Sequence, residues 1–322
     1  MSNAIVGIDV SKKDLSITMI INDNSNYCNI TNDKKGFKEF SKWLKLHKVQ
    51  KVKACMESTG IYSLAFGDYL FSQKHEVSIV NPACIHAFAK SKLSRHKTDK
   101  VDSKIIAEYA SKYELKPYIP TDPVILELRS LYNCILNLDG QHKQIQNYLE
   151  GKEQLAPEVI KTYEKLSSNL LKEIEKIESH IDQLLDNNPE IKEDIDNIQT
   201  IPGVGKKTAV AVMSLVGNIR GFKDARQLAA FVGLTPREHT SGSSIKKQAR
   251  ISRMGNAQIR KALYFPAMSA MQHNVFMRQF AIKLKSKGKS GKVIVVAIMR
   301  KLLHIIFGVI KNKTVFDASL RG

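Results

Sequence analysis

The residues best suited to chemistry are four carboxylates that the sequence places in three separate elements. Asp9 and Glu57 stand at or near the ends of apolar runs. Asp99 and Asp102 are three residues apart in a helical pattern, so they share one helix face. Carboxylates held together repel one another, and a hard cation such as Mg²⁺ or Mn²⁺ resolves that conflict. A pair of such ions clamps the attacking and leaving oxygens of a phosphodiester displacement, so this chemistry is the one to expect.

Alternating strand and helix patterns in the first 110 residues position these acids. β-Branched and apolar runs predict strands, and apolar residues three and four apart predict helices. The order β-β-β-α-β-α-β-α is that of the ribonuclease-H-like α/β fold, in which the first and fourth strands are neighbours. Ser58 or Thr59 is the expected N-cap of the second helix. The expected strands are 4–10, 15–21, 27–30, 49–56 and 77–80, and the expected helices are 36–46, 58–71 and 98–111.

The middle of the chain has a helical pattern of its own. Residues 166–184 carry apolar side chains mostly three and four apart, which predicts long helices and is compatible with a coiled-coil hairpin. Such a stripe serves packing within one chain as well as self-association, and the sequence leaves both open. The most apolar run, 293–310, contains Arg300, Lys301 and His304, so we expect a buried helix there rather than a membrane span.

Charge is concentrated toward the C-terminal end. Residues 201–322 hold 23 Lys and Arg against three acids, a net charge of +20, whereas residues 1–200 are nearly neutral. This imbalance favours nucleic-acid phosphates as the partner, because neutralising them releases counterions. A basic face kept for solubility is the alternative. No signal peptide is expected, and the four scattered cysteines are typical of reduced thiols, so we expect a cytoplasmic, nucleoid-associated protein that uses no membrane.

A Gly-x-Gly turn opens the basic segment. Gly203 and Gly205 precede Lys206, Lys207 and an apolar helix pattern, an arrangement similar to the turn of helix-hairpin-helix modules. Backbone N–H groups at such a helix start can bind a phosphate. A plain helix cap is the alternative, and the spacing excludes a Walker loop.

Six motifs stand along the chain: GIDVSK at 7–12, MESTG at 56–60, KTDKVDSK at 97–104, IPGVG at 201–205, FVGLTPREHTSG at 231–242 and RISRMGN at 250–256. In this order they resemble the DEDD transposases of bacterial insertion sequences, a group that includes the pilin-gene invertases. The resemblance implies a RuvC-like N-terminal domain whose acids bind Mg²⁺, and those acids fall on the four carboxylates above. The helical middle resembles the family only in its helical character.

The same resemblance implies a serine nucleophile after a Pro-Arg-x-His run, which here is Ser241. The family often has Ser-Ser-Gly where this chain has Thr-Ser-Gly, and Ser243 and Ser244 follow, so residue type alone does not single out the nucleophile. A serine that only shapes a turn is the alternative. His239 would shuttle a proton or be structural. The cationic residues expected to clamp phosphate are Arg237, Arg250 and Arg253.

The resemblance further implies partners: donor and target DNA, a structured noncoding guide called a bridge RNA, and further copies of the chain in a dimer or tetramer. The sequence thus predicts a RuvC-like DEDD domain at 1–115, a helical coiled-coil region at 116–198, and a basic, mainly α-helical domain with the serine at 199–322. The predicted function is a transposase or recombinase that cuts and rejoins DNA through a serine assisted by the metal site.

Three alternatives differ in chemistry. A RuvC-like structure-specific endonuclease, such as a junction resolvase, would need the acids but no serine. A nucleic-acid-binding regulator with an inactive catalytic site is disfavoured, because all four acids are present. An actin-like phosphotransferase is disfavoured by the basic C-terminal third and by the lack of a second phosphate-binding glycine motif.

Overall fold

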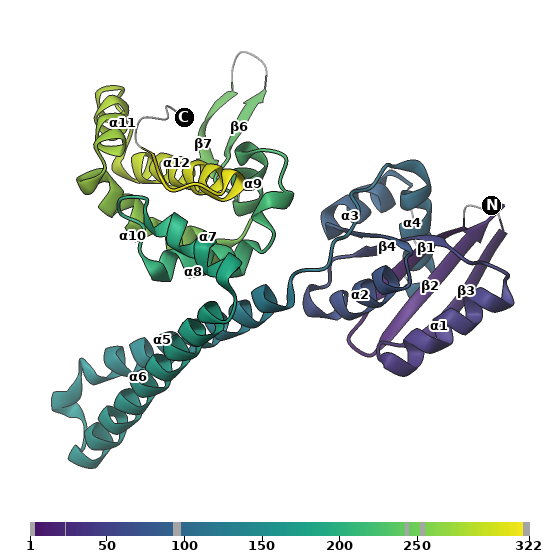
Figure 1. Cartoon of the computed structure of the whole chain (residues 1–322), viewed down its shortest axis with the longest axis horizontal. Helices are drawn as coiled ribbons and strands as arrows, with labels where there is room; N and C mark the ends of the chain where they lie inside the picture. Colours follow the sequence, from purple (N-terminus) through teal and green to yellow (C-terminus); the bar gives the residue numbers. More distant parts are fainter. Residues whose placement is uncertain (1–3, 23, 93–97, 242–244, 252–254, 318–322) are drawn as a thin grey trace. The chain divides into compact units, whose positions relative to one another are not determined.

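The computed structural model describes residues 4–22, 24–92, 98–241, 245–251 and 255–317, and side chains at 237–250 lie outside the described part. The chain divides into two compact units, residues 1–120 and 121–322 (Figure 1). Each unit has its own hydrophobic core. The helical middle and the basic segment both belong to the second unit, and the three-part division by composition stays a prediction.

The first unit is built on a mixed five-stranded sheet with the strand order β3-β2-β1-β4-β5. Its first three strands form an antiparallel meander, and the other two run parallel to the first. The prediction that the first and fourth strands are neighbours is therefore confirmed. The strands are β1 (Ala4–Val10), β2 (Asp14–Ile21), β3 (Asn24–Thr31), β4 (Val52–Glu57) and β5 (Glu76–Val80).

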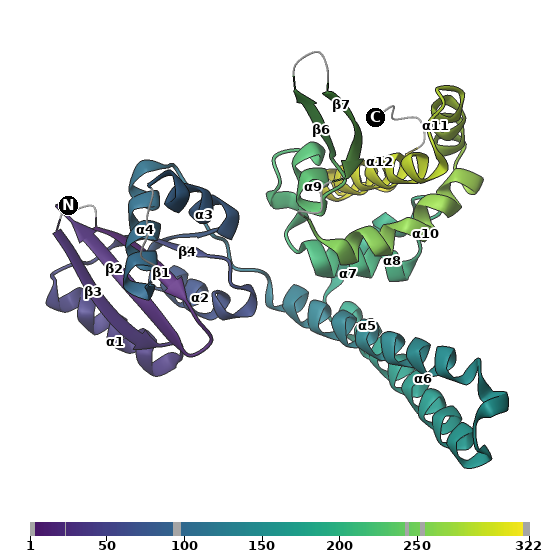
Figure 2. The ribbon, with the colours of Figure 1, turned by 180° about the vertical axis from the view of Figure 1, so that it is seen from behind.

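Helices cover both faces of this sheet: α1 (Lys34–Leu46), α2 (Leu64–Ser72), α3 (Pro82–Ser91) and α4 (Asp99–Lys112). The helices α1 and α2 lie on one face, where Ile8 of β1 shares a core with Phe66 of α2. The helices α3 and α4 lie on the other face, where Cys55 of β4 packs with Ile106 of α4 (Figures 1 and 2). Successive strand residues point to opposite faces, so Gly7 and Asp9 belong to the face of α4.

The start of the second helix differs from its prediction. A short 3₁₀ turn, η1 (Gly60–Tyr62), comes first, and α2 begins only at Leu64. Gly60 has φ +63°, a left-handed conformation that a helix cannot include. Ser63 holds the N-cap position without a side-chain cap bond, so the prediction of Ser58 or Thr59 as the N-cap is wrong.

The helix α3 was not predicted at all. Asn81 and Pro82 end β5, as their types indicate, but they also start a helix. The Asn81 side chain accepts a hydrogen bond of 2.9 Å from the Ala83 backbone N–H. Proline is well suited to the first helical turn, where its missing N–H costs nothing.

The second unit is mainly helical. The two long helices α5 (Pro123–Leu149) and α6 (Pro157–Asp186) pack against each other as a hairpin, as the apolar stripe predicts (Figure 1). A two-stranded antiparallel ribbon was not predicted in this part of the chain. The other elements are η2 (Lys152–Gln154), α7 (Pro189–Gln199), α8 (Lys206–Val216), η3 (Ile219–Gly221), α9 (Ala225–Val232), β6 (Pro236–Ser241), β7 (Ile245–Ile251), α10 (Ala257–His273), α11 (Val275–Ser286) and α12 (Gly291–Asn312).

The helix α12 is the central core helix of this unit. By length and composition alone it could cross a membrane, but 56% of its most apolar window is buried inside the protein. Ile298, Leu302 and Ile306 are fully buried and belong to the core that α8, α9 and α10 complete. The expectation of a buried helix at 293–310 is confirmed.

One ion pair ties α7 to the turn after α8. Both carboxylate oxygens of Asp194 accept hydrogen bonds from the Arg220 guanidinium, at 2.6 and 2.7 Å. The Asp194 side chain is only 7% exposed, whereas that of Arg220 is 39% exposed. Such a bidentate pair fixes geometry as well as charge.

Asp194→Ala should therefore lower the free energy of unfolding by about 2 kcal/mol, because it leaves the guanidinium without its partner. Urea unfolding of the full chain measures the change. Asp196→Ala, which removes an exposed carboxylate from the same helix, should stay within about 0.5 kcal/mol of the parent. Equal losses in the two variants would contradict a special role for the pair.

Candidate metal centre

Strand register brings the first two acids together. β1 and β4 are parallel, and the last pair in their register is Ile8 and Met56. Continuing this register by one residue places Asp9 opposite Glu57. Asp9 follows Gly7 by two residues, and Glu57 follows Cys55 by two residues. Gly7 and Cys55 lie on the face covered by α4, so both acids belong to that face as well. Both side chains are half-buried at the carboxyl end of the central strands.

The helix α4 approaches β1 unusually closely, and Gly7 makes this possible. A Cβ atom on Gly7 would lie 2.2 Å from the Ala107 backbone nitrogen and 2.2 Å from the Ser103 carbonyl oxygen. A second contact fixes the helix next to it: the hydroxyls of Thr18 and Ser103 form a hydrogen bond of 2.8 Å. Ser103 is fully buried and Thr18 is 2% exposed. These two contacts therefore fix the position of α4 on the sheet.

The other two acids occupy the first turn of α4. Thr98 caps the helix by accepting a hydrogen bond from the Val101 backbone N–H at 3.3 Å, which confirms the expected helix start. Asp99 is exposed and Asp102 is half-buried. Carboxylates are favourable at a helix N-terminus, where the backbone N–H groups carry partial positive charge. This position offsets part of the cost of bringing four acids together.

The electrostatics of Asp9 show that the four acids sense one another. The pKa of Asp9 is raised from 3.8 to about 6, first by burial and then by the negative charges of the other three acids, of which Asp102 contributes most. A hydrogen bond from the Val10 backbone N–H lowers it in part. A divalent cation would relieve this repulsion, since carboxylate oxygens are the ligands that Mg²⁺ prefers.

The donor set fits a hard divalent cation in chemistry, because all four side chains are carboxylates. Within the part of the chain that the structure describes, no three ligating side chains stand close enough together to hold one ion. Binding a metal therefore requires these side chains to draw together. The Asp99 side chain is free to change its rotamer in this way, because it is exposed on the first turn of α4.

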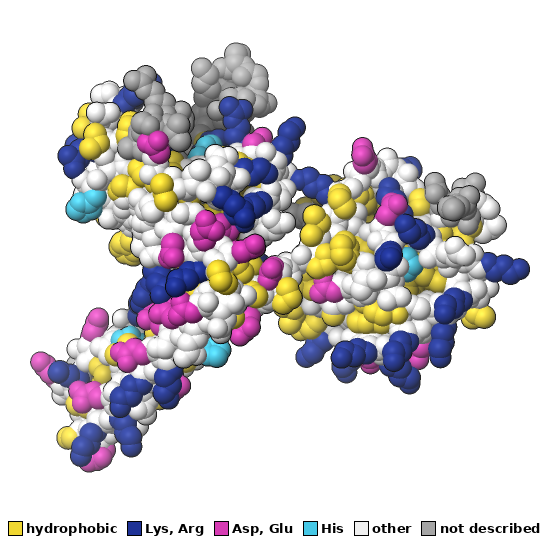
Figure 3. Space-filling model, in the orientation of Figure 1, with side chains coloured by type: hydrophobic (Ala, Val, Ile, Leu, Met, Phe, Trp, Pro, Cys, Tyr) yellow, Lys and Arg dark blue, Asp and Glu magenta, His cyan; other side chains and the backbone are white. Residues whose placement is uncertain are grey.

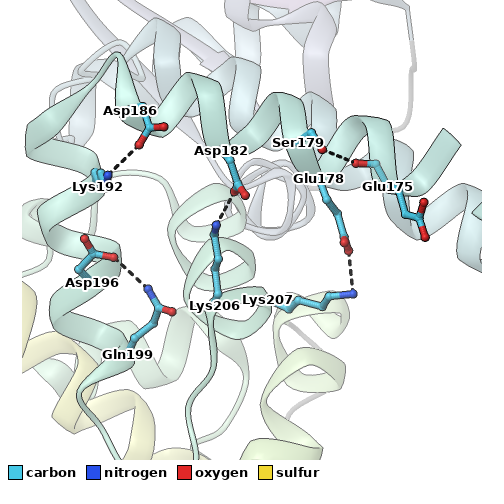
Figure 4. A network of polar contacts seen from close by, with 10 residues as sticks. All are labelled: Glu175, Glu178, Ser179, Asp182, Asp186, Lys192, Asp196, Gln199, Lys206 and Lys207. Carbon is cyan, nitrogen blue, oxygen red and sulfur yellow. Dashed lines mark hydrogen bonds and ion pairs between the residues drawn. The ribbon is translucent and has the colours of Figure 1, made fainter. Parts of the chain in front are cut away.

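The predicted phosphate-binding lysines have acidic partners in this structure (Figure 4). Lys206 forms an ion pair with Asp182, and Lys207 forms one with Glu178 at 2.7 Å, both on α6. The acids of α6 thus neutralise the lysines that begin α8. Their role in binding nucleic acid stays a prediction, and it would require these pairs to open.

The first glycine of the Gly-x-Gly turn has a packing role. Gly203 has φ +92°, and a Cβ there would lie 2.7 Å from the Ala270 backbone nitrogen of α10. Gly205 is the N-cap of α8. Packing against α10 accounts for Gly203 and the plain helix cap accounts for Gly205, and phosphate binding stays a prediction.

The residues predicted around the serine lie on the ribbon. Ser241 is the last residue of β6, where it pairs with Ile245 of β7. Arg237 and Arg250 are cross-strand partners. The side chains of these residues and of His239 lie outside the described part, as do residues 243, 244 and 253 entirely.

The two hydroxyls that fix α4 on the sheet, those of Thr18 and Ser103, were not predicted from the sequence. A signal was present, because β2 alternates: its polar Ser16 and Thr18 interrupt an otherwise apolar strand. Buried polar residues need hydrogen-bond partners, so Thr18 predicts a partner on the covering helix. Its identity as Ser103 depends on a contact between distant parts of the chain, which one sequence does not give.

A mixed sheet of this order, with acids at the carboxyl end of its central strands, is consistent with the ribonuclease-H-like class of metal-dependent nucleases. Comparison with known protein families narrows this class of nucleases to transposases. The DEDD transposase family of the IS110 type matches residues 6–152, and the transposase IS116/IS110/IS902 family matches residues 195–281.

Individual relatives agree with the families. The pilin gene-inverting proteins of Moraxella bovis and Moraxella lacunata are each 34% identical to this chain over 98% of both lengths. The transposase for insertion sequence element IS1111A of Coxiella burnetii is 43% identical over 25% of this chain and 22% of its own length. The chain belongs to the IS110/IS116/IS902 family of transposases, enzymes that cleave and transfer DNA strands, and a DEDD domain of this kind implies a divalent metal.

The raised pKa of Asp9 makes the metal-free protein sensitive to pH. Between about pH 4 and pH 6 the folded state binds more protons than the unfolded state, so stability falls as the pH rises through this window. Asp9→Asn should raise the unfolding free energy of the metal-free protein at pH 7.5 by about 1 kcal/mol, after allowance for solvent screening, and by much less at pH 4.

Thermal unfolding with EDTA or with Mg²⁺ tests this expectation. Mg²⁺ should raise the Tm of the parent at pH 7.5 and have little effect on Asp9→Asn. Asp14→Asn, at an exposed position of β2, serves as the control and should behave like the parent. If Mg²⁺ stabilised the Asp9 variant as much as the parent, Asp9 would not be a ligand.

The close approach of α4 gives a second expectation. Gly7→Ala should cost about 1–3 kcal/mol of stability, because the helix must shift away from the strand. The same shift should weaken Mn²⁺ binding, which isothermal titration measures. Gly140→Ala lies in α5 with no atom within 4 Å of the added Cβ, so it should not destabilise the protein. An unchanged Mn²⁺ affinity in Gly7→Ala would show that the close packing of α4 on β1 is not needed for metal binding.

Proposed function

We propose that this transposase cuts and rejoins DNA through Ser241, assisted by a divalent-metal site made of Asp9, Glu57, Asp99 and Asp102. The observation that carries the proposal is the convergence of these carboxylates from β1, β4 and α4 on one face of the sheet. The family's activity requires that strands be rejoined after cutting. The chain shows no nucleotide-binding loop in its sequence, so a covalent intermediate is the simplest way to conserve the bond energy.

The chemical steps follow from the groups involved. The Ser241 oxygen attacks the phosphorus of a DNA phosphodiester, a new oxygen–phosphorus bond forms, and a strand hydroxyl leaves. The serine proton passes to a base, for which His239 is the neighbouring candidate, and the leaving strand oxygen takes up a proton to become the hydroxyl. A hydroxyl of another strand then attacks the phosphoserine and restores the serine. Bound Mg²⁺ or Mn²⁺ would stabilise charge on the phosphoryl oxygens, held by the four carboxylates.

Partners are part of the proposal. The net charge of +20 in residues 201–322 supports binding of DNA and of a structured guide RNA. Contact between the serine of one copy and the acids of another would require a dimer or tetramer. Leu166 and Leu171 of α6 are each 45% exposed, and they offer apolar surface for such self-association.

A RuvC-like structure-specific endonuclease is the alternative. It would use the same acids to activate water and would form no covalent bond to the protein. The two mechanisms therefore differ in one product, a protein–DNA adduct.

Ser241→Ala should abolish both the adduct and strand exchange, while DNA binding and the Tm stay close to those of the parent. Denaturing gel electrophoresis with end-labelled DNA detects the adduct. Ser243→Ala and Ser244→Ala are the matched controls and should retain it. An adduct that persists in Ser241→Ala and disappears in either control would move the nucleophile, and cleavage without any adduct in the parent would favour the endonuclease.

A further inference from the structure

A row of side chains continues from the acids across the sheet. Asp9 pairs with Ser16 of β2, and Ser16 pairs with Asn29 of β3. One step along the strands, Gly7 pairs with Thr18, and Thr18 pairs with Tyr27. Directly opposed residues of neighbouring strands share a face, so Asn29 and Tyr27 lie on the same face as the carboxylates.

The outer end of this row is open. Tyr27 is 37% exposed and Asn29 is exposed, whereas Ile30, which points to the face of α1, is 6% exposed. The helix α4 covers β1 and reaches β2 at the Thr18–Ser103 bond. The edge strand β3 therefore exposes an aromatic ring and an amide beside the carboxylates, and such groups can stack on and hydrogen-bond to a ligand.

Hydrogen bonds hold these groups in a fixed arrangement. The hydroxyls of Ser16 and Tyr27 lie 3.2 Å apart, and the Asn29 amide donates to the Ser16 oxygen at 3.3 Å. Lys100 of α4 places its ammonium 5.5 Å from the centre of the Tyr27 ring. We name the set of Ser16, Tyr27, Asn29 and Lys100 the polar shelf.

The position of Lys100 links the shelf to the metal site. It stands between Asp99 and Asp102 in the first turn of α4. Its ammonium lies beside the Tyr27 ring and belongs to the helix turn that carries two of the acids, so its positive charge can offset the repulsion between carboxylates and an incoming phosphate. A cation beside an exposed aromatic ring is the pairing that single-stranded nucleic-acid grooves use.

We propose that the polar shelf binds the DNA strand next to the phosphodiester that is cut, in an unpaired form. Lys100 and Asn29 contact its phosphates, and an unstacked base packs on the Tyr27 ring. This inference rests on the proposed function, because it takes the four acids as the place of cutting. It adds a strand-binding surface on β2 and β3 that the acids and Ser241 do not supply.

Photo-crosslinking locates the strand without any need for cleavage. The full-length protein is mixed with a twenty-nucleotide oligothymidylate carrying one 4-thiothymidine, irradiated in the presence of Mg²⁺ and digested with trypsin. Residues 14–34 form a single tryptic peptide because no Lys or Arg lies between Lys13 and Lys34. We expect an adduct on this peptide, at Tyr27.

Matched variants separate a binding role from a structural one. Tyr27→Ala and Lys100→Ala should lower the yield on peptide 14–34 about tenfold, as expected for loss of one stacked base or of its phosphate contact. Tyr27→Phe should retain most of the yield, because stacking needs the ring and not the hydroxyl. Tyr148→Ala on α5 and Lys38→Ala on α1 remove comparably exposed groups elsewhere and should not change it.

The outcomes distinguish this inference from the proposed function. Crosslinks confined to the basic segment, or an equal loss in Tyr27→Phe and Tyr27→Ala at unchanged Tm, would overturn the shelf. A crosslink on Tyr27 without cleavage or adduct formation would keep the shelf and contradict the proposed chemistry. Cleavage with an adduct but no crosslink on peptide 14–34 would support the proposed chemistry and overturn the polar shelf.

Discussion

The contact of α4 with β1 is the constraint on which the first unit depends. At Gly7 the helix backbone lies where any side chain would have been, and the Thr18–Ser103 hydrogen bond fixes the helix beside that point. A helix is rigid over a few turns, so fixing it at Ser103 also fixes its first turn. Asp99 and Asp102 are therefore placed by the packing of Ser103, which directly follows Asp102 and lies about one helical turn from Asp99, in a part of the core that carries no charge.

The same arrangement explains why the site is costly without a metal. The sheet alone holds Asp9 and Glu57 side by side, and the seated helix brings two further charges toward them. Packing energy from the apolar contacts of α4 pays for this repulsion. Because the core holds the backbone, the acids can relax only through their side chains, and a site strained in this way is poised for a cation.

The sequence predicted the elements that carry the four acids, because the signals for strands and helices are local. Asp9 stands one residue before the end of β1 and Glu57 stands at the end of β4, and a two-residue period decides which face of the sheet each acid occupies. Prediction was weaker wherever one signal serves two purposes. Asn81 and Pro82 end a strand and also start a helix, and only the first role was predicted. Partners that come from distant elements, such as Ser103 for Thr18, were not predictable from one sequence.

The basic segment shows the same limit for charge. Lys206 and Lys207 looked like phosphate ligands in the sequence, yet α6 supplies a carboxylate to each, and acidic and basic side chains are interspersed over the α5–α6 hairpin (Figures 3 and 4). Counterion release needs cations that are free to meet phosphate, so paired lysines contribute less than their number implies. Residues 221–322 contain 20 Lys and Arg against three acids. The electrostatic attraction for nucleic acid must therefore come chiefly from the part of the chain that follows η3, where the predicted serine also stands.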